Sequence, residues 1–522
     1  MKQSVMAFLL ALLPMAAGAY DVRIDGIYYN LVRKANIAEV VAGDEPYEGD
    51  VNIPSTFTYN GMDYTVSYIT DGIFSGSSIT SITLPDEVRE IGENAFKNCQ
   101  NLKSVVLPRN LRAIRDFAFQ NCTALQDISF PSSLILIAHQ SFENCTSLTS
   151  LDLPDGMEEI NAGAFRGCTG LVSLHLPNSI RLISEYTFYD CSSLETVEIP
   201  ESVEEIWNST FYRCGLKSIS IPETVRYIGY GAFMECEQLT SVRLPEKLTK
   251  MESYVFSGCS HLKEVAIPQG VTSIGQNAFA GTAITAIDIP SGVINIEDYA
   301  FQGCRHLTSV LIPEGTALGY GLFRDCTGLT SVQLPSGLET LNGFMFDGCI
   351  SLKDIALGDH LKSIGDYAFG GCKSLESVVI PNSVTELQVR CFEGCTNMET
   401  LTIGSGVNWI GDRAFADCKN LLDVYCYATT VPVSSNTFEG SYINYTVLHV
   451  PASAIEDYRT AYNWKDFGRI EAIGETAIRD VRTDIGAEDT PCYSLGGVRI
   501  AQPRKGIYIR NGKKFSAGVR PR

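Results

Sequence analysis

Residues 91–108 read IGENAFKNCQNLKSVVLP, and similar stretches recur many times along the chain. Residues 114–131 read IRDFAFQNCTALQDISFP and residues 137–154 read IAHQSFENCTSLTSLDLP. A phenylalanine marks each copy, in steps of 22 or 23 residues, and this short period predicts a solenoid of stacked units. The marker phenylalanines are Phe74, Phe96, Phe119, Phe142, Phe165, Phe188, Phe211, Phe233, Phe256, Phe279, Phe301, Phe323, Phe346, Phe369, Phe392, Phe415 and Phe438.

Each unit contains two short apolar patterns. In runs such as LTSLDLP at 148–154, two apolar residues alternate across a variable one, which predicts a short strand with one face buried. Proline ends this strand because it has no N–H for the ladder. A second pair, as in VREIG at 88–92, predicts another extended segment, and the AFxxC element predicts a helical turn with Phe and Cys inside. No unit can bury its apolar edge alone, so about sixteen units must stack.

The pattern LxxIxLPxxVxxIGxxAFxxCxxL resembles the BspA-like leucine-rich repeats, a family of mostly surface or secreted proteins of Bacteroidota and some protozoa. The resemblance extends from Ile73 to about Cys426. It implies a β-rich solenoid, a right-handed coil of about sixteen units with short helical turns, capped at both ends and followed by a small β tail. It implies no particular ligand, because members of the family bind different things.

The segments outside the repeat suggest a division of the chain. Residues 1–19 join Lys2 to an apolar run and end in small residues, which is typical of a cleaved secretory signal peptide. A membrane anchor is the alternative, but the apolar run is short for a bilayer. We expect an N-terminal β cap over 20–72, with Asn60-Gly61 as a hairpin turn, and the solenoid over 73–426.

The C-terminal part divides again. Over 427–474 we expect a cap with a short helix at 452–463, started by Ser453 and closed against the last coil by Trp464 and Phe467. Residues 475–522 predict a small β tail, and residues 491–522 hold eight Lys or Arg and no acid. YSLGG at 493–497 and KGIYI at 505–509 resemble the C-terminal sorting tails of Bacteroidota secreted proteins, although Val498 and the final SAGVRPR depart from that pattern.

The cysteines follow the repeat. The sequence has 17, and fourteen stand three residues after a marker phenylalanine. A disulfide framework is one interpretation in a secreted protein. We favour free buried thiols, because equivalent side chains of stacked coils point in parallel and Thr282 takes the cysteine position in one unit. A zinc site is less favoured, since no CxxC pair with a matching second pair appears and Cys391 and Cys395, both in one unit, lack His partners.

The variable position of each predicted strand should face solvent, beside a column of Ser and Thr that we read as structural. Three neighbours in this row, Asp152, His175 and Glu198, could hold a divalent metal or serve catalysis, but an exposed ion-paired cluster is the simpler interpretation. The partner-binding candidates in the row are Asp152, His175, Glu198, Arg243, Asp288, Gln333 and Tyr425.

Composition limits the function. The net charge of -20 argues against nucleic-acid binding, which needs a clustered basic face. No nucleophile motif, phosphate loop or HExxH helix is present, so we expect no enzyme and no cofactor. We expect a secreted or cell-surface adhesion or interaction protein, whose partner is a protein or glycan on a host or neighbouring cell. A carbohydrate-binding module is the alternative, and a metal-dependent enzyme at Asp152, His175 and Glu198 is a less favoured second one.

Overall fold

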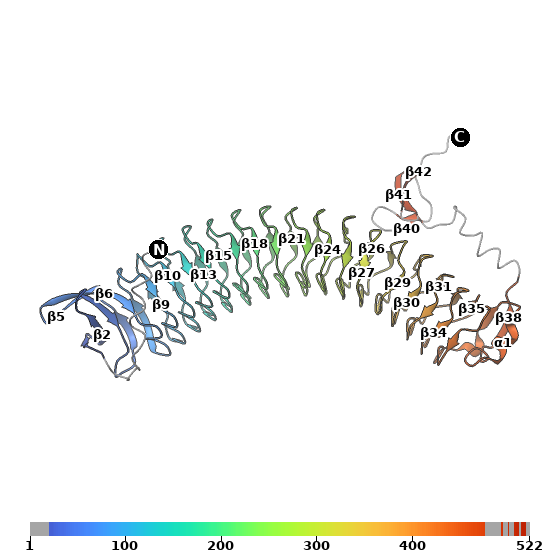
Figure 1. Cartoon of the computed structure of the whole chain (residues 1–522), viewed down its shortest axis with the longest axis horizontal. Coiled ribbons are helices and arrows are strands. Elements are labelled where there is room, and N and C mark those ends of the chain that lie inside the picture. The colour runs from blue at the N-terminus through green and yellow to red at the C-terminus, as the bar shows by residue number, and fades with distance from the viewer. Residues whose placement is uncertain (1–19, 475–491, 494–498, 501–505, 511–512, 518–522) are drawn as a thin grey trace. The chain divides into compact units, whose positions relative to one another are not determined.

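A computed structural model describes residues 20–474, 492–493, 499–500, 506–510 and 513–517. The predicted signal peptide at 1–19 and most of the predicted tail lie outside these residues. The described chain divides into two compact units, one ending at Leu216 and the other beginning at Lys217, and each is treated by itself. In both, short parallel strands of successive coils lie side by side, so that each unit is a β-solenoid (Figure 1).

The first unit begins with a five-stranded sheet of order β1-β2-β3-β6-β5, drawn in blue in Figure 1. Strands β5 and β6 form the predicted hairpin, with Tyr59 opposite Met62. Asn60 and Gly61 both have positive φ, 53° and 76°, which is the conformation of a type I′ turn. The strands of this sheet are β1 (Val22–Ile24), β2 (Ile27–Val32), β3 (Ile37–Val40), β5 (Thr56–Tyr59) and β6 (Met62–Ile69).

The coils of the first unit carry two columns of parallel strands. The first column comes from the LTSLDLP-type runs and consists of β4 (Glu48–Asn52), β7 (Ser78–Thr83), β9 (Ser104–Val106), β11 (Asp127–Ile128), β13 (Ser150–Asp152), β15 (Ser173–His175) and β17 (Thr196–Glu198). The second comes from the VREIG-type runs and consists of β8 (Glu90–Ile91), β10 (Ala113–Ile114), β12 (Leu136–Ile137), β14 (Glu159–Ile160), β16 (Leu182–Ile183) and β18 (Glu205–Ile206).

The second unit repeats this plan. Its first column consists of β19 (Ser218–Ser220), β21 (Ser241–Arg243), β23 (Glu264–Val265), β26 (Ser309–Leu311), β28 (Ser331–Gln333), β31 (Ser377–Ile380), β33 (Thr400–Ile403), β35 (Asp423–Cys426), β37 (Val447–Val450) and β38 (Arg469–Ala472). Its second column consists of β20 (Tyr227–Ile228), β22 (Lys250–Met251), β24 (Ser273–Ile274), β25 (Asn295–Ile296), β27 (Ala317–Leu318), β29 (Thr340–Leu341), β30 (Ser363–Ile364), β32 (Glu386–Leu387), β34 (Trp409–Ile410) and β36 (Val433–Ser434).

The marker phenylalanines form the core of both units. Each ring lies nearly parallel to the ring of the next coil, with centroids 5.0 Å apart for Phe119 and Phe142 and 5.4 Å for Phe142 and Phe165. The stack runs from Phe74 to Phe211 in the first unit and from Phe233 to Phe438 in the second. These side chains are fully or almost fully buried, which confirms the predicted internal column.

The sixteen described cysteines outside the tail are all free and buried, as predicted. Thirteen of the fourteen thiols of the repeat column donate to the carbonyl oxygen of the marker phenylalanine one coil earlier, as Cys168 does to Phe142 at 3.2 Å. Ser441 replaces cysteine in the last unit and donates to Phe415 in the same way, at 2.7 Å. Thr282 donates instead to Phe279 of its own coil, at 2.8 Å. The cysteine position therefore selects a small buried donor.

The AFxxC segment differs in detail from the expected helical turn. It consists of turns with i→i+3 hydrogen bonds, such as Lys97 N–H to Asn94 and Cys99 N–H to Phe96. Left-handed residues flank the phenylalanine on both sides, Asn94 with φ 56° and Asn98 with φ 62° in this unit. A helix cannot propagate through such residues, and Asn and Gly tolerate them best.

The C-terminal end of the second unit closes the core. Helix α1 (Ile455–Thr460) is shorter than expected, and its N-cap residue is Ala454 with no side-chain cap, so the capping role predicted for Ser453 is wrong. Trp464 and Phe467 contact the ring of Phe438 edge-on, at 5.6 and 5.1 Å, and so cover the last coil as predicted. A short 3₁₀ turn, η1 (Ile443–Tyr445), precedes them.

In the tail, four strands form a sheet of order β40-β39-β41-β42. Strands β41 and β42 pair antiparallel, with Arg510 opposite Lys513. The strands are β39 (Cys492–Tyr493), β40 (Arg499–Ile500), β41 (Gly506–Arg510) and β42 (Lys513–Ala517).

Replacement of a central stacked ring should destabilise the fold. We expect Phe142→Ala to lower the free energy of unfolding by about 3–5 kcal/mol, because it leaves a cavity between two rings. Urea unfolding followed by circular dichroism measures this change. The control is Val106→Ala, whose side chain is 57% exposed and whose effect should stay within about 0.5 kcal/mol. Equal unfolding midpoints for the two variants would contradict the stacked core.

The buried thiols should make the fold sensitive to alkali. Burial raises the pKa of Cys168 from 9.0 to about 12, so the unfolded thiol ionises at a lower pH than the folded one. The contribution of Cys168 to stability is therefore intact below pH 9 and falls above it, by about 1.4 kcal/mol at pH 10. We expect the free energy of unfolding of the wild type, relative to Cys168→Ser, to fall by this amount between pH 7 and pH 10. If the free energies of unfolding of the wild type and of Cys168→Ser differ by the same amount at pH 7 and pH 10, the prediction is wrong.

Candidate interaction surfaces

The predicted outward row exists on the first column of strands. Asp152, His175 and Glu198 lie on β13, β15 and β17, where Asp152 pairs in register with His175 and His175 with Glu198. All three residues are exposed. Within the described residues, no group of three His, Cys, Asp or Glu side chains is placed to hold a metal ion. A partner-binding role for this row stays a prediction.

The other predicted members of the row are less uniform. Arg243 on β21 is exposed and forms a long ion pair with Glu223, at 3.5 Å. Asp288 is exposed, but residues 286–290 form no strand, contrary to expectation. The ladder hydrogen bond from Thr285 N–H to the Lys263 carbonyl oxygen is long there, at 3.4 Å, which weakens strand pairing in this coil. Gln333 is half-buried rather than exposed.

Tyr425 takes part in a cluster that the sequence did not predict. It lies on β35 in register with His449 on β37, and the two rings stack with centroids 4.3 Å apart. The Nε2 atom of His449 lies 2.8 Å from Oδ1 of Asp423, which fixes the imidazole. Burial, and then the nearby Asp423 carboxylate, raise the pKa of Tyr425, so its hydroxyl stays protonated at neutral pH. This cluster is a half-buried aromatic platform with a fixed carboxylate.

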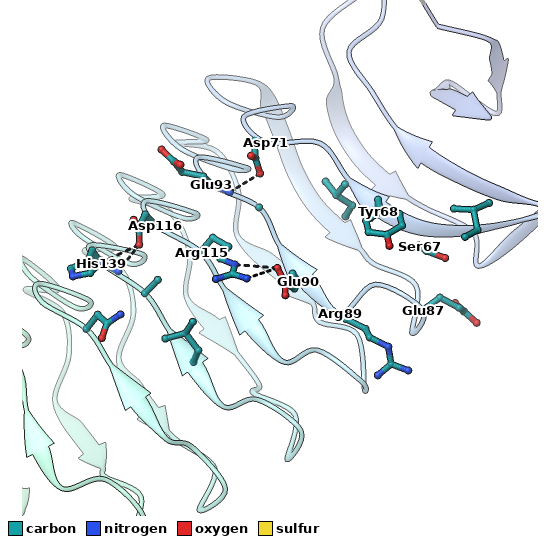
Figure 2. A pocket seen from close by; sticks show the side chains of 16 residues that line it. Ser67, Tyr68, Asp71, Glu87, Arg89, Glu90, Glu93, Arg115, Asp116 and His139 are labelled. Atoms are coloured by element: carbon teal, nitrogen blue, oxygen red, sulfur yellow. Dashed lines mark hydrogen bonds and ion pairs between the residues drawn. The ribbon is translucent and has the colours of Figure 1, made fainter. Parts of the chain in front are cut away.

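A groove runs along the second column of the first unit. Its first part has a volume of about 950 Å³ and lies where the N-terminal sheet meets the coils. Figure 2 shows Ser67 and Tyr68 of β6 at one side and Glu90, Arg115 and His139 from successive coils along the floor. The second part, about 570 Å³, continues past β14 and β16 to Trp207. The two parts share His139 and Asn161, so they form one continuous groove.

The outward positions of the short strands form the floor. Because side chains alternate along a strand, Ile91 and its equivalents point into the core while the residues on either side of them face the groove. Most of the coils place polar residues there. Leu136, Leu182 and Trp207 are apolar exceptions, and Leu182 and Trp207 are 40% and 41% exposed. The second part of the groove is therefore mainly apolar.

Charged side chains line the first part of the groove. The guanidinium of Arg115 donates to Glu90 at 2.7 Å, and Nδ1 of His139 lies 3.3 Å from Asp116 (Figure 2). The Asp71 carboxylate accepts the backbone N–H of Glu93 at 2.9 Å. Over both parts, eight carboxylates face three guanidinium groups, so the groove is negatively charged at neutral pH.

Sequence reasoning concentrated on the first column and missed this groove. The available signal was the position after each inward apolar residue of the second column, where Trp207 stands in place of the Gly, Arg, Ala, Asn, Ser, Glu or Gln of other units. Together with the exposed Leu182, Trp207 makes this part of the groove a candidate for contact with a partner.

Comparison with protein families gives one match. The family model described as "BspA type Leucine rich repeat region" matches the chain in six copies, over residues 67–195, 181–308 and 316–444. A comparison with curated proteins gave no match. In the described residues, no helix combines the length and apolarity needed to cross a membrane.

Solved structures give further matches. A leucine-rich repeat protein from Bacteroides ovatus ATCC 8483 is 28% identical with a TM-score of 0.53, over 87% of this chain and 100% of that chain. A leucine rich cell surface protein from Faecalibacterium prausnitzii A2-165 is 28% identical with a TM-score of 0.42, over 74% and 94%. A leucine-rich repeat protein from Eubacterium ventriosum ATCC 27560 is 20% identical with a TM-score of 0.41, over 80% and 98%.

Proposed function

The chain belongs to the BspA-type leucine-rich repeat family, and from this membership we propose that it is a secreted or cell-surface protein that binds a macromolecular partner through its repeats. Secretion is supported by the charged, apolar and small-residue order of residues 1–19. The repeats support binding because a solenoid presents a long, regular surface relative to its length. Leucine-rich repeat solenoids are typically non-enzymatic, in keeping with an interaction role.

The groove of the first unit is the observation that carries the proposal. It combines exposed apolar side chains with charged ones on a rigid floor of paired strands. Anchors of this kind, an aromatic side chain surrounded by polar groups, dominate the energy of protein–protein contacts. Trp207 is the largest apolar side chain in the groove, and its indole N–H donates to Glu205 at 3.0 Å, which orients the ring.

Retention on a host surface tests this proposal. We expect the full chain to be retained on at least one immobilised extracellular matrix protein or on intact epithelial cells, above an albumin-coated background. Trp207→Ala should weaken the affinity behind that retention about thirtyfold, because an aromatic anchor that becomes buried on binding contributes about 2 kcal/mol. The control is Tyr462→Ala, a 64% exposed aromatic residue remote in sequence from the groove. Retention on none of these surfaces would argue against an adhesive role.

Carbohydrate binding is a second candidate, supported by the cluster of Tyr425, His449 and Asp423. An aromatic ring can stack on the apolar face of a sugar, and a carboxylate can accept its hydroxyl groups. In this cluster the ring and the carboxylate are held by the same imidazole, so both are ordered before a ligand binds. The first column therefore offers a sugar-sized platform near the end of the second unit.

A glycan array tests the second candidate. We expect any glycan signal to fall at least about tenfold in Tyr425→Ala, because stacking on one ring contributes on the order of 1–3 kcal/mol. The exposed Tyr445, outside this cluster, provides the control variant Tyr445→Ala, which should bind as the wild type does. An array without signal for the wild type would end the carbohydrate hypothesis.

A further inference from the structure

We propose that the groove of the first unit binds an extended peptide segment in which apolar residues recur at about every third position among lysine or arginine residues. The inference rests on the proposed function and specifies its partner. It depends on three properties of the groove: its length, its apolar seats and its unpaired carboxylates.

The length of the groove fits an extended peptide. It crosses six parallel strands, β8, β10, β12, β14, β16 and β18, and a strand spacing of about 4.8 Å gives about 24 Å between the outer two. An extended chain covers this distance with about seven or eight residues. Strand β10 is paired with β8 and β12, and β12 with β10 and β14, so a peptide cannot join the sheet there as another strand. Strands β14 and β16 belong to two separate sheets. Over β10 and β12, side chains must therefore provide the recognition.

The groove offers seats for apolar side chains at intervals. Tyr68, 61% exposed, stands at the N-terminal end; Leu136 lies on β12, Leu182 on β16, and Trp207 directly after β18. Leu136 and Leu182 stand two coils apart, about 10 Å, which is near the distance between every third residue of an extended peptide. A peptide with several apolar side chains can therefore engage more than one seat.

The charge of the groove favours basic side chains at the positions of the peptide that do not occupy apolar seats. Of the three guanidinium groups, that of Arg115 is paired with Glu90 and that of Arg181 with Glu204, at 2.7 and 3.2 Å. Among the residues that the structure describes, the carboxylates of Glu87, Glu158, Glu159 and Glu185 form no ion pair. These four carboxylates are therefore available to cations of a partner.

The same charge excludes other partners. Nucleic acids and anionic glycans would be repelled by a negatively charged groove. A metal ion alone would leave the apolar seats empty, and the described residues contain no suitable group of ligands. A lysine or arginine side chain satisfies a carboxylate and can also lie over the exposed ring of Trp207.

Fluorescence anisotropy with a labelled probe tests the inference on the full chain. The probe is an eight-residue peptide with leucine at every third position and lysine elsewhere, and the matched negative probe has glutamate in place of each lysine. We expect the lysine–leucine peptide to bind in 50 mM salt and to bind about tenfold more weakly in 500 mM salt, because surface charge attraction is screened. The glutamate–leucine peptide should not bind.

Matched charge reversals locate the site. We expect Glu158→Lys with Glu159→Lys to weaken binding of the lysine–leucine peptide about tenfold or more, since two attractions become repulsions. The control, Asp152→Lys with Glu198→Lys, makes the same change in charge on the other column of strands and should alter affinity less than about twofold. Thermal unfolding midpoints of both double variants confirm that they are folded.

Three results would overturn the inference: no binding of the lysine–leucine peptide, equal binding of the glutamate–leucine peptide, or equal loss in both double variants. A chain that is retained on matrix proteins but ignores the lysine–leucine peptide refutes the partner and leaves the proposed function standing. A neutral glycan that binds in the groove and is lost in Trp207→Ala would likewise replace the peptide as partner.

Discussion

The structure depends on the close stacking of one phenyl ring on the next. Rings about 5 Å apart fix the rise of each coil, and this rise matches the spacing of paired strands. Both columns of strands can therefore stay in register only while every coil has nearly the same length. That constraint explains why the marker phenylalanines recur in steps of 22 or 23 residues.

Residue types can vary at the surface positions of the repeat but not at the core positions. A strand residue that faces outward is not needed for stacking, so Asp152, His175 and Glu198 can follow one another on one column while Leu136, Leu182 and Trp207 appear on the other. The paired strands hold all these side chains at a fixed spacing before any partner arrives. Such preorganisation lowers the entropy cost of binding, which suits a surface whose affinity is spread over many weak contacts.

Much of the fold could be predicted because each inward position recurs many times. The rings, the thiols and the Asn60-Gly61 turn all follow from local patterns with one physical solution. The turn at AFxxC was less predictable, because two left-handed residues interrupt what reads as a helical segment. The groove and the pairing of Tyr425 with His449 escaped prediction because both join residues from several coils, and a period describes one coil at a time.

The hydrogen bonds of the cysteine column have an evolutionary consequence. Coils such as those of Cys145, Cys168 and Cys191 each give one donor to the preceding coil and offer one carbonyl to the following coil, so the two neighbours of such a coil meet the same chemistry. Duplication or deletion of a whole unit in the gene therefore creates no new kind of junction within the protein. The terminal caps can remain unchanged while the molecule lengthens or shortens, and selection can adjust its reach one coil at a time.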